Sequence, residues 1–412
     1  MANNIFANNF KKVFTIALTA TLIVSGFFVA SFALAAHTAT VTVDPIIVKG
    51  GTSGTYIFDI TNDGPDSVNY IKITAPSGFL IQGSLVTNLG SEWVCSNTNS
   101  YVLCQVDYRS SQIILSDGTV TMTFSAISAG PVGDTAYNWT VFSYDIAVSN
   151  YTDSTTVQTT VDVMAPTTGI SEIPVSWVNE DISVILTCDD GIGVGCKEIH
   201  YTISDGSEVV VAGSVANFNV SCSEGNVCKT SITYYSIDNF DQVETPEKTS
   251  DLIRIDRQAP KTDIETEGLT YKEEGEEGRF YIALDVKFTL SAADEGSGVS
   301  STSTYYKIDD GTDTVYAEAF TLSGLDEGIH AISYWSVDNV GNIEEAQTLT
   351  VFVDDADPIV GEIIIEPFYF DGVTNYISAT PTISASVNDA DGSGIAGCEY
   401  TLNGESIGLE RK

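Results

Sequence analysis

The residues that could carry chemistry begin with the cysteines, of which the chain has seven. Six of them form close pairs, each separated by a short stretch that contains Gly or Ser: Cys95 and Cys104, Cys188 and Cys196, Cys222 and Cys228. In an oxidising compartment such pairs form local disulfides that staple hairpins or loops. Zinc is the alternative, but there is no C-x-x-C and His200 is the only histidine near a pair. We expect disulfides, although Cys188 could instead pair with Cys222 or Cys228, and Cys398 is left over.

No pattern of catalytic residues stands out in the sequence. It has neither the G-x-S-x-G of a nucleophile elbow nor the H-E-x-x-H of a zinc protease. Its three histidines, His37, His200 and His330, are scattered. Paired carboxylates are so abundant that no pair is singled out for glycosidase chemistry. We therefore predict a protein that is not an enzyme and has no catalytic residues.

Calcium is the one cofactor that the side chains suggest. Hard cations bind carboxylate, amide and backbone oxygens on loops, whereas the alternative is that Asp and Asn only cap turns of their own backbone. The run at 389–394 resembles the start of an EF-hand loop, but Tyr400 stands where that loop needs Glu. The candidate ligands of a structural calcium are Asp338, Asn339, Asp354, Asp355, Asp357, Asp389 and Asp391.

Three N-x-S/T sequons are candidate glycosylation sites in an exported chain, at Asn138, Asn150 and Asn219. Chance occurrence in a sequence rich in Ser and Thr explains them equally well.

The N-terminus carries an export signal. Lys11 and Lys12 precede an apolar stretch from Val13 to Phe32, and small residues with an A-x-A pattern follow at 33–36. This is the pattern of a secretory signal peptide, although about 20 apolar residues can also span a bilayer as an uncleaved anchor. In both cases residues 1–35 direct the rest of the chain out of the cell, so we predict an extracellular or cell-surface location.

Composition excludes several classes of partner. The 412 residues include 17 Lys and Arg against 56 Asp and Glu, a net charge of -39. Such a surface repels phosphates, so we expect no nucleic-acid partner and no membrane contact other than through the N-terminal segment. With 43% hydrophobic residues, the chain is too apolar for a disordered acidic protein.

Internal repetition organises the exported part. Tyr234-Tyr235-Ser236-Ile237-Asp238-Asn239 recurs 100 residues later as Tyr334-Trp335-Ser336-Val337-Asp338-Asn339, and each copy is followed by a hydrophobic residue and Glu. A Gly-x-Gly loop preceded by acid occurs three times, at 191–194, 296–299 and 392–395. Prolines 166, 260 and 358 punctuate the units. These landmarks predict domains at 37–163, 166–257 and 259–355, with a shortened one at 357–412.

Within each unit, short alternating runs rich in Val, Ile, Thr, Tyr and Phe lie between turns. About seven strands in about 100 residues predict an immunoglobulin-like β-sandwich. The expected fold class is therefore all-β, with tandem immunoglobulin-like sandwiches after an N-terminal apolar helix. His330 then falls at the tyrosine-corner position, two residues before the inward-facing Ile332, where a polar ring bonds back to the preceding backbone.

Two sets of residues carry a resemblance. The turn Asn62-Asp63-Gly64-Pro65, and the run Gly90 to Cys95 with its second Cys at 104, resemble a conserved immunoglobulin-like repeat of prokaryotic surface proteins. Gly296 to Asn342 resembles bacterial and archaeal immunoglobulin-like repeats, from which the 166–257 unit departs at Phe240-Asp241-Gln242. Both resemblances imply surface-exposed modules of stalks or adhesive arrays.

The sequence therefore predicts a non-catalytic cell-surface or secreted protein, a stalk, envelope component or adhesin, whose ligand is an unidentified surface molecule, glycan or envelope component. The alternative is an accessory module array of an exported hydrolase or carbohydrate-binding protein. Since only 18 residues follow Gly394, we expect the polypeptide to continue beyond Lys412 and, in that alternative, to carry the functional domain there.

Overall fold

The computed structural model describes residues 38–145, 153–273, 278–390, 392–402 and 405–409. These residues form strands and no helix, so the all-β prediction is confirmed for this part of the chain. The predicted N-terminal signal or anchor, residues 1–35, lies outside it. Within the described ranges no helix is long and apolar enough to cross a membrane.

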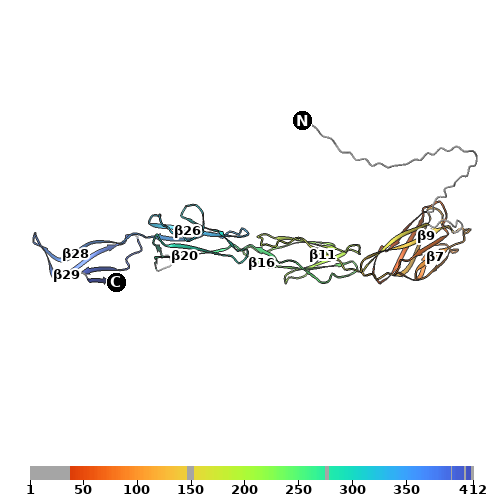
Figure 1. Cartoon of the computed structure of the whole chain (residues 1–412), viewed down its shortest axis with the longest axis horizontal. Helices are drawn as coiled ribbons and strands as arrows, with labels where there is room; N and C mark the ends of the chain where they lie inside the picture. The colour runs from red at the N-terminus through yellow and green to blue at the C-terminus, as the bar shows by residue number, and fades with distance from the viewer. Residues whose placement is uncertain (1–37, 146–152, 274–277, 391, 403–404, 410–412) are drawn as a thin grey trace, which may run out of the picture. The chain divides into compact units, whose positions relative to one another are not determined.

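The chain divides into two compact units. The first comprises residues up to 129 and 136–159, and the second comprises 130–135 and 160 onward. Strands β7 and β9 mark the first unit in Figure 1, and β11, β16, β20, β26, β28 and β29 mark the second.

Two sheets make up the first unit, in the orders β1-β3-β8-β5 and β2-β10-β9-β4-β7-β6. Their side chains alternate between the core and solvent, as a strand period of two requires, and Trp139 lies fully buried among Tyr56, Phe58, Phe79 and Phe124. The strands are β1 (Ala39–Asp44), β2 (Ile47–Lys49), β3 (Ser53–Asn62), β4 (Tyr70–Thr74), β5 (Leu80–Thr87), β6 (Val94–Asn97), β7 (Tyr101–Gln105), β8 (Thr119–Ile127), β9 (Thr135–Tyr144) and β10 (Asp153–Asp162).

The second unit begins with strands that enclose one apolar core between the sheets β11-β12-β15 and β14-β13-β17-β18 and the pair β16-β19. Val184, Leu186, Ile199, Ile232 and Ile255 are fully buried in it. These strands are β11 (Thr167–Ile170), β12 (Ile182–Asp189), β13 (Cys196–Ile203), β14 (Val209–Ala212), β15 (Val215–Val220), β16 (Val227–Thr230), β17 (Ile232–Asp238), β18 (Lys248–Thr249) and β19 (Ile253–Asp256).

A separate core follows in the next repeat, around the fully buried Val286, Phe288, Ile332 and Val351. The pair β20-β23 and the sheet β21-β22-β27-β26-β24-β25 contribute to it. These strands are β20 (Lys261–Glu267), β21 (Thr270–Lys272), β22 (Phe280–Ile282), β23 (Lys287–Ala293), β24 (Val299–Ile308), β25 (Thr314–Val315), β26 (Gly328–Asp338) and β27 (Gln347–Val353).

The last part of the unit consists of two hairpins. They pair β28 (Ile359–Phe370) with β29 (Asn375–Asn388), and β30 (Cys398–Leu402) with β31 (Glu405–Leu409). Large apolar side chains of the first hairpin, such as Phe368, Tyr369 and Ile383, are exposed.

A buried glutamate joins the two sheets at the same place in both complete repeats of the second unit. Glu344 accepts hydrogen bonds from the backbone N–H and hydroxyl of Thr262 on β20, and from the backbone N–H of Ser336 on β26. In the preceding repeat, Glu244 accepts the equivalent bonds from Thr168 and Ser236. We call each set the glutamate clamp, because it satisfies buried donors of both sheets with one carboxylate.

The two clamps differ in the residue that completes them. Lys248 lies 2.8 Å from a carboxylate oxygen of Glu244, whereas the Gln347 side-chain amide donates to Glu344 over 2.6 Å. Burial alone would raise the pKa of Glu244, but the bonds from Lys248 and Thr168 outweigh it and lower that pKa below its usual value.

Replacing Glu344 with Ala leaves the buried donors of Thr262 and Ser336 without an acceptor. We expect a loss of about 3 kcal/mol in the free energy of unfolding, because each unsatisfied buried group costs about 1–3 kcal/mol. The measurement is the midpoint of urea unfolding. Glu345 is exposed, so Glu345→Ala is the matched control and should change stability by no more than about 0.5 kcal/mol. Equal losses in the two variants would contradict the clamp.

Candidate functional site

Asp162 and Asp256 are the last residues of β10 and β19, and Asp354 directly follows β27. Each of the three lies four residues before a proline that opens a repeat. In every case an Oδ2 atom accepts a hydrogen bond from a backbone N–H in the loop of the next repeat. The bonds are Asp162 with Val194 at 2.8 Å, Asp256 with Ser297 at 2.6 Å and Asp354 with Ser393 at 2.7 Å. The bonds of Asp256 and Asp354 therefore connect successive repeats of the second unit by the same contact.

A second aspartate belongs to the loop itself. Its Oδ2 accepts the backbone N–H of the loop's last glycine: Asp190 with Gly195 at 2.7 Å, Asp294 with Gly298 at 2.6 Å and Asp389 with Gly394 at 2.6 Å. These three glycines have φ of +88°, +81° and +88°, a left-handed conformation that other residues adopt only with strain. The loop sequence thus fixes where the carboxylate lies.

These bonds correct the residue-by-residue alignment of the first two loops that the sequence suggested. The sequence aligned Gly191 and Gly193 of the first loop with Gly296 and Gly298 of the second. In the structure the partners of the two aspartates show that Gly193 and Gly195 are the equivalent residues, two positions later. The side-chain amides of Asn239 and Asn339 confirm this, since they donate to the carbonyls of Gly195 and Val194 and to that of Ser297.

The first glycine of each loop lets the aspartates approach. A Cβ on Gly296 would lie 2.3 Å from the Asp256 carboxylate, and one on Gly193 would lie 2.5 Å from Oδ2 of Asp190 and 3.0 Å from Oδ2 of Asp162. Gly392 faces Asp354 and Asp389 in the same way. A side chain at these positions would push the carboxylates apart.

A third aspartate comes from the repeated Ser-x-Asp-Asn motif at the end of β17 or β26. Oδ1 of Asp338 caps its own turn by accepting the backbone N–H of Val340 and Asn342, and Oδ2 accepts the Asn342 side-chain amide. Asp238 does the same with Phe240 and Gln242. The longer Gln242 side chain also reaches Oδ1 of Asp162 at 2.8 Å, whereas Asn342 reaches only the Asp256 carbonyl.

The outcome is two compact carboxylate clusters, both within the second unit. In the first, ligand atoms of Asp134, Asp162 and Asp190 lie within 4.8 Å of one another, and in the second, those of Asp256, Asp294 and Asp338 do so. Asp162 and Asp256 are fully buried. We call them the first and second clusters.

Burial and mutual repulsion disfavour ionisation of these acids. Desolvation, followed by the charges of Asp162, Asp238 and Asp134, raises the pKa of Asp190 to about 6. The pKa values of Asp162 and Asp294 are also raised, first by burial and then by neighbouring aspartates. Among the described residues, no lysine or arginine forms an ion pair with any acid of the two clusters.

The structure separates the residues that the sequence named as calcium ligands. Asp338 lies in the second cluster, and Asp354 and Asp389 meet at Gly392. Asn339 instead fastens the loop through its amide. Asp355 and Asp357 are exposed and belong to neither cluster. Asp391 lies outside the described residues.

Sequence reasoning did not select most of the clustered acids. Asp134, Asp162, Asp190, Asp256 and Asp294 were not among the candidate ligands, although the acids that precede the glycine loops, which include Asp190 and Asp294, had been noted as part of the repeat. A signal was available: an Asp stands four residues before each of the prolines 166, 260 and 358. Asp134 has no repeated counterpart and carried no signal.

The cysteines form disulfides within each close pair, Cys95 with Cys104, Cys188 with Cys196 and Cys222 with Cys228. Cys398 is unpaired. Of the sequon residues, Asn138 on β9 and Asn219 on β15 are exposed, which is compatible with modification but does not test it, and Asn150 lies outside the described residues.

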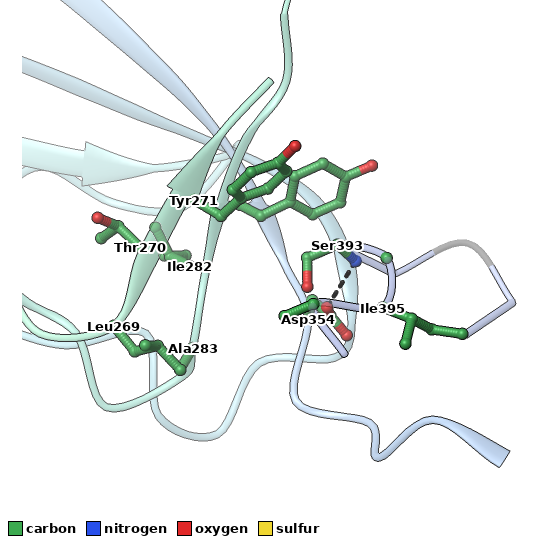
Figure 2. A pocket seen from close by; sticks show the side chains of 11 residues that line it. Leu269, Thr270, Tyr271, Ile282, Ala283, Asp354, Ser393 and Ile395 are labelled. Carbon is green, nitrogen blue, oxygen red and sulfur yellow. Dashed lines mark hydrogen bonds between the residues drawn. The ribbon is translucent and has the colours of Figure 1, made fainter. Parts of the chain in front are cut away.

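A shallow pocket of about 270 Å³ lies beside the contact of Asp354 with Ser393. Figure 2 shows Leu269, Thr270, Tyr271, Ile282 and Ala283 on one side of it, facing Ile395 and the hydrogen-bonded Ser393 and Asp354. Its lining is largely apolar and contains a single carboxylate, Asp354, which the loop backbone already engages.

Comparison with known proteins gives structural likenesses only. No family model matches the chain, and no curated protein matches it. A tetra-tandem repeat from the extending region of a large adhesion protein is 12% identical, covers 91% of this chain and 87% of that one, and has a TM-score of 0.29. BcpA, the major pilin subunit of Bacillus cereus, is 10% identical over 52% of this chain and 65% of its own, with a TM-score of 0.24.

A membrane-anchored protein from Corynebacterium diphtheriae is 11% identical over 77% of this chain and 89% of that one, with a TM-score of 0.20. These neighbours are bacterial pilin, adhesion and anchored proteins. At such TM-scores they support no assignment of function to this chain.

His330 occupies a structural position rather than a reactive one. Its Nε2 bonds to the carbonyl of Asp326, four residues back, and its Nδ1 bonds to the Asp309 carboxylate at 2.7 Å. The ring therefore bonds back to the preceding backbone, as the sequence predicts. Burial would lower the pKa of His330, but the bonds to Asp309 and Asp326 outweigh it and raise that pKa above 6.5.

This raised pKa makes stability depend on pH. Protonated His330 stabilises the fold fully below the unfolded pKa of about 6.5, and the contribution is lost as pH rises through the higher folded pKa. We expect His330→Gln to cost about 1.5–3 kcal/mol at pH 6, the range for hydrogen bonds to charged groups, and less at pH 9. Urea unfolding at both pH values measures this. Asp310→Asn, at an exposed neighbour, should show no such change, and a pH-independent loss in His330→Gln would contradict the assignment.

Proposed function

We propose that the chain is a non-catalytic structural or adhesive protein of the cell surface, in which tandem sandwiches act as a stalk or as an adhesive array. The observation that carries the proposal is the repeated junction. Twice within the second unit, the aspartate at the end of one repeat accepts a backbone N–H from the loop of the next. A contact that recurs with the same geometry is what a serial array of modules needs.

The glutamate clamps support the same interpretation. Each of the two complete repeats of the second unit fastens its own two sheets with its own carboxylate and has its own apolar core. A repeat that is stabilised internally and contacts its neighbours at its ends can transmit force along the array, because its stability does not require a hydrophobic core shared with another repeat.

Disulfides support an extracellular setting. Cys188–Cys196 and Cys222–Cys228 both close short loops of one sandwich, and Cys95–Cys104 staples a hairpin of the first unit. Such bonds persist in oxidising compartments and are rare in the reducing cytosol. The net charge of -39 keeps such a surface soluble and repels other acidic surfaces.

The location is tested on cells of the organism that makes the protein. An antibody against residues 259–355 should label intact cells, or detect the protein in the medium. The recovered, denatured protein should titrate with one free thiol before reduction and seven after it, because Cys398 alone is unpaired. Labelling only after permeabilisation, together with seven free thiols before reduction, would overturn the proposed location.

The stalk function is tested by stretching single molecules of the full chain. Separate unfolding events are expected, including one of about 300 Å for the cysteine-free sandwich at 259–355. Reduction should lengthen the event of the 166–257 sandwich by about 50 Å, since its disulfides span 8 and 6 residues, and should leave the 259–355 event unchanged. One joint unfolding event for both sandwiches would show that they are not serial modules.

A further inference from the structure

We propose that the first and second clusters are two calcium sites within the second unit, and that the second ties the end of one sandwich to the loop of the next. The first would bind Ca²⁺ through Asp134, Asp162 and Asp190, and the second through Asp256, Asp294 and Asp338. This inference rests on the geometry of the second unit and does not depend on where the protein is located.

Asp190 carries the inference for the first cluster. Its side chain is only 9% exposed. The Gly195 backbone accounts for one of its carboxylate oxygens, but Oδ1 is buried and has no hydrogen-bond partner among the described residues. Because a buried carboxylate oxygen without a partner is costly, a ligand at Oδ1 is expected.

The second cluster shows the same deficiency at the equivalent residue. Oδ1 of Asp294 is buried and lacks a partner within the described part of the chain, while its Oδ2 accepts two backbone N–H groups of the loop. The hydroxyl of Ser297 is buried without a partner as well, although the backbone N–H of Ser297 donates to Asp256. The unused oxygens therefore recur 104 residues apart, at corresponding places of the two loops.

Turn capping explains only part of this arrangement. It accounts for both oxygens of Asp338 and for Oδ2 of each loop acid. It does not explain why three buried or half-buried carboxylates converge in each of two clusters without a cationic side chain. A cation offsets their repulsion and supplies the missing partner.

The ligand chemistry favours calcium, and the distances permit it. The available groups are all oxygens, which hard cations prefer, and Ca²⁺ binds them at about 2.3–2.6 Å. Oxygens on opposite sides of one Ca²⁺ are thus about 4.6–5.2 Å apart, so ligand atoms that lie within 4.8 Å of one another can share one ion. Mg²⁺ binds at about 2.0–2.1 Å and demands a tighter octahedron, so it should bind more weakly.

Calcium at these places would act on the connections between repeats. In the second cluster, Asp256 ends β19 of one sandwich, whereas Asp294 and Asp338 belong to the next. A bound ion would therefore add a bond across a junction that is otherwise held by hydrogen bonds such as Asp256 to Ser297. Removing it should leave each apolar core in place and weaken the coupling between them.

The test is titration calorimetry of CaCl₂ into the full, calcium-depleted chain, combined with thermal unfolding in EDTA and in saturating Ca²⁺. We expect two sites with a Kd at or below about 10⁻³ M and a rise in Tm of about 10 °C at saturation. Asp190→Asn and Asp294→Asn should each remove one site, and the double variant both. MgCl₂ should bind at least tenfold more weakly.

Asp355→Asn is the matched control, because it removes one exposed acid beside Asp354 that belongs to neither cluster. It should retain two sites, which separates specific binding from loose attraction to an acidic chain. Asp190 and Asp294 lie in different sandwiches, so a folding defect in one variant, checked by circular dichroism, leaves the other informative. No saturable binding near 10⁻³ M, or equal stoichiometry in all three single variants, would overturn the proposal.

Discussion

The buried glutamate of each clamp is the interaction on which the arrangement of the second unit depends. Glu244 and Glu344 are buried and satisfy donors of both sheets, and they thereby fix the position of β17 against β11 and of β26 against β20. The clamped serine lies two residues before the aspartate that ends the same strand, as in Ser336 and Asp338. Since strand side chains alternate in direction, fixing the serine also fixes the side on which the aspartate leaves the strand.

From that point the junction follows from short-range geometry. The Asp338 turn positions Asn342, whose amide reaches the backbone carbonyl of Asp256 in the preceding repeat. The glycine loop then brings Asp294 against Asp256, because Gly296 has no Cβ to separate them. The same Ser, Asp and Glu motif thus joins the two sheets of one sandwich and contacts the neighbouring sandwich. This explains why the three residues recur together in the sequence.

The sequence was sufficient for the fold and only partly sufficient for the site. Alternation in runs such as 232–238 marks strands directly, and the spacing of the cysteines limits them to local partners. The loop correspondence was wrong because the first loop, Gly191-Ile192-Gly193-Val194-Gly195, contains two overlapping Gly-x-Gly patterns. Only the hydrogen bonds to Asp162 and Asp190 show which of them matches the second loop. Asp355 and Asp354 are likewise indistinguishable by type, and differ in that one side chain faces the loop and the other faces solvent.

The two junctions relieve the same repulsion by different means. Gln242 is one methylene longer than Asn342 and donates its amide to both Asp162 and Asp238, so a neutral side chain supports two carboxylates of the first junction. That junction, however, also contains Asp134, whose Oδ1 accepts the backbone N–H of Val163 and Met164. At the second cluster, the Asn342 amide donates to the Asp338 carboxylate and to the Asp256 carbonyl rather than to a second carboxylate. The longer amide of Gln242 is thus found where the additional carboxylate of Asp134 is present. This is expected if buried carboxylates must each be satisfied by hydrogen-bond donors.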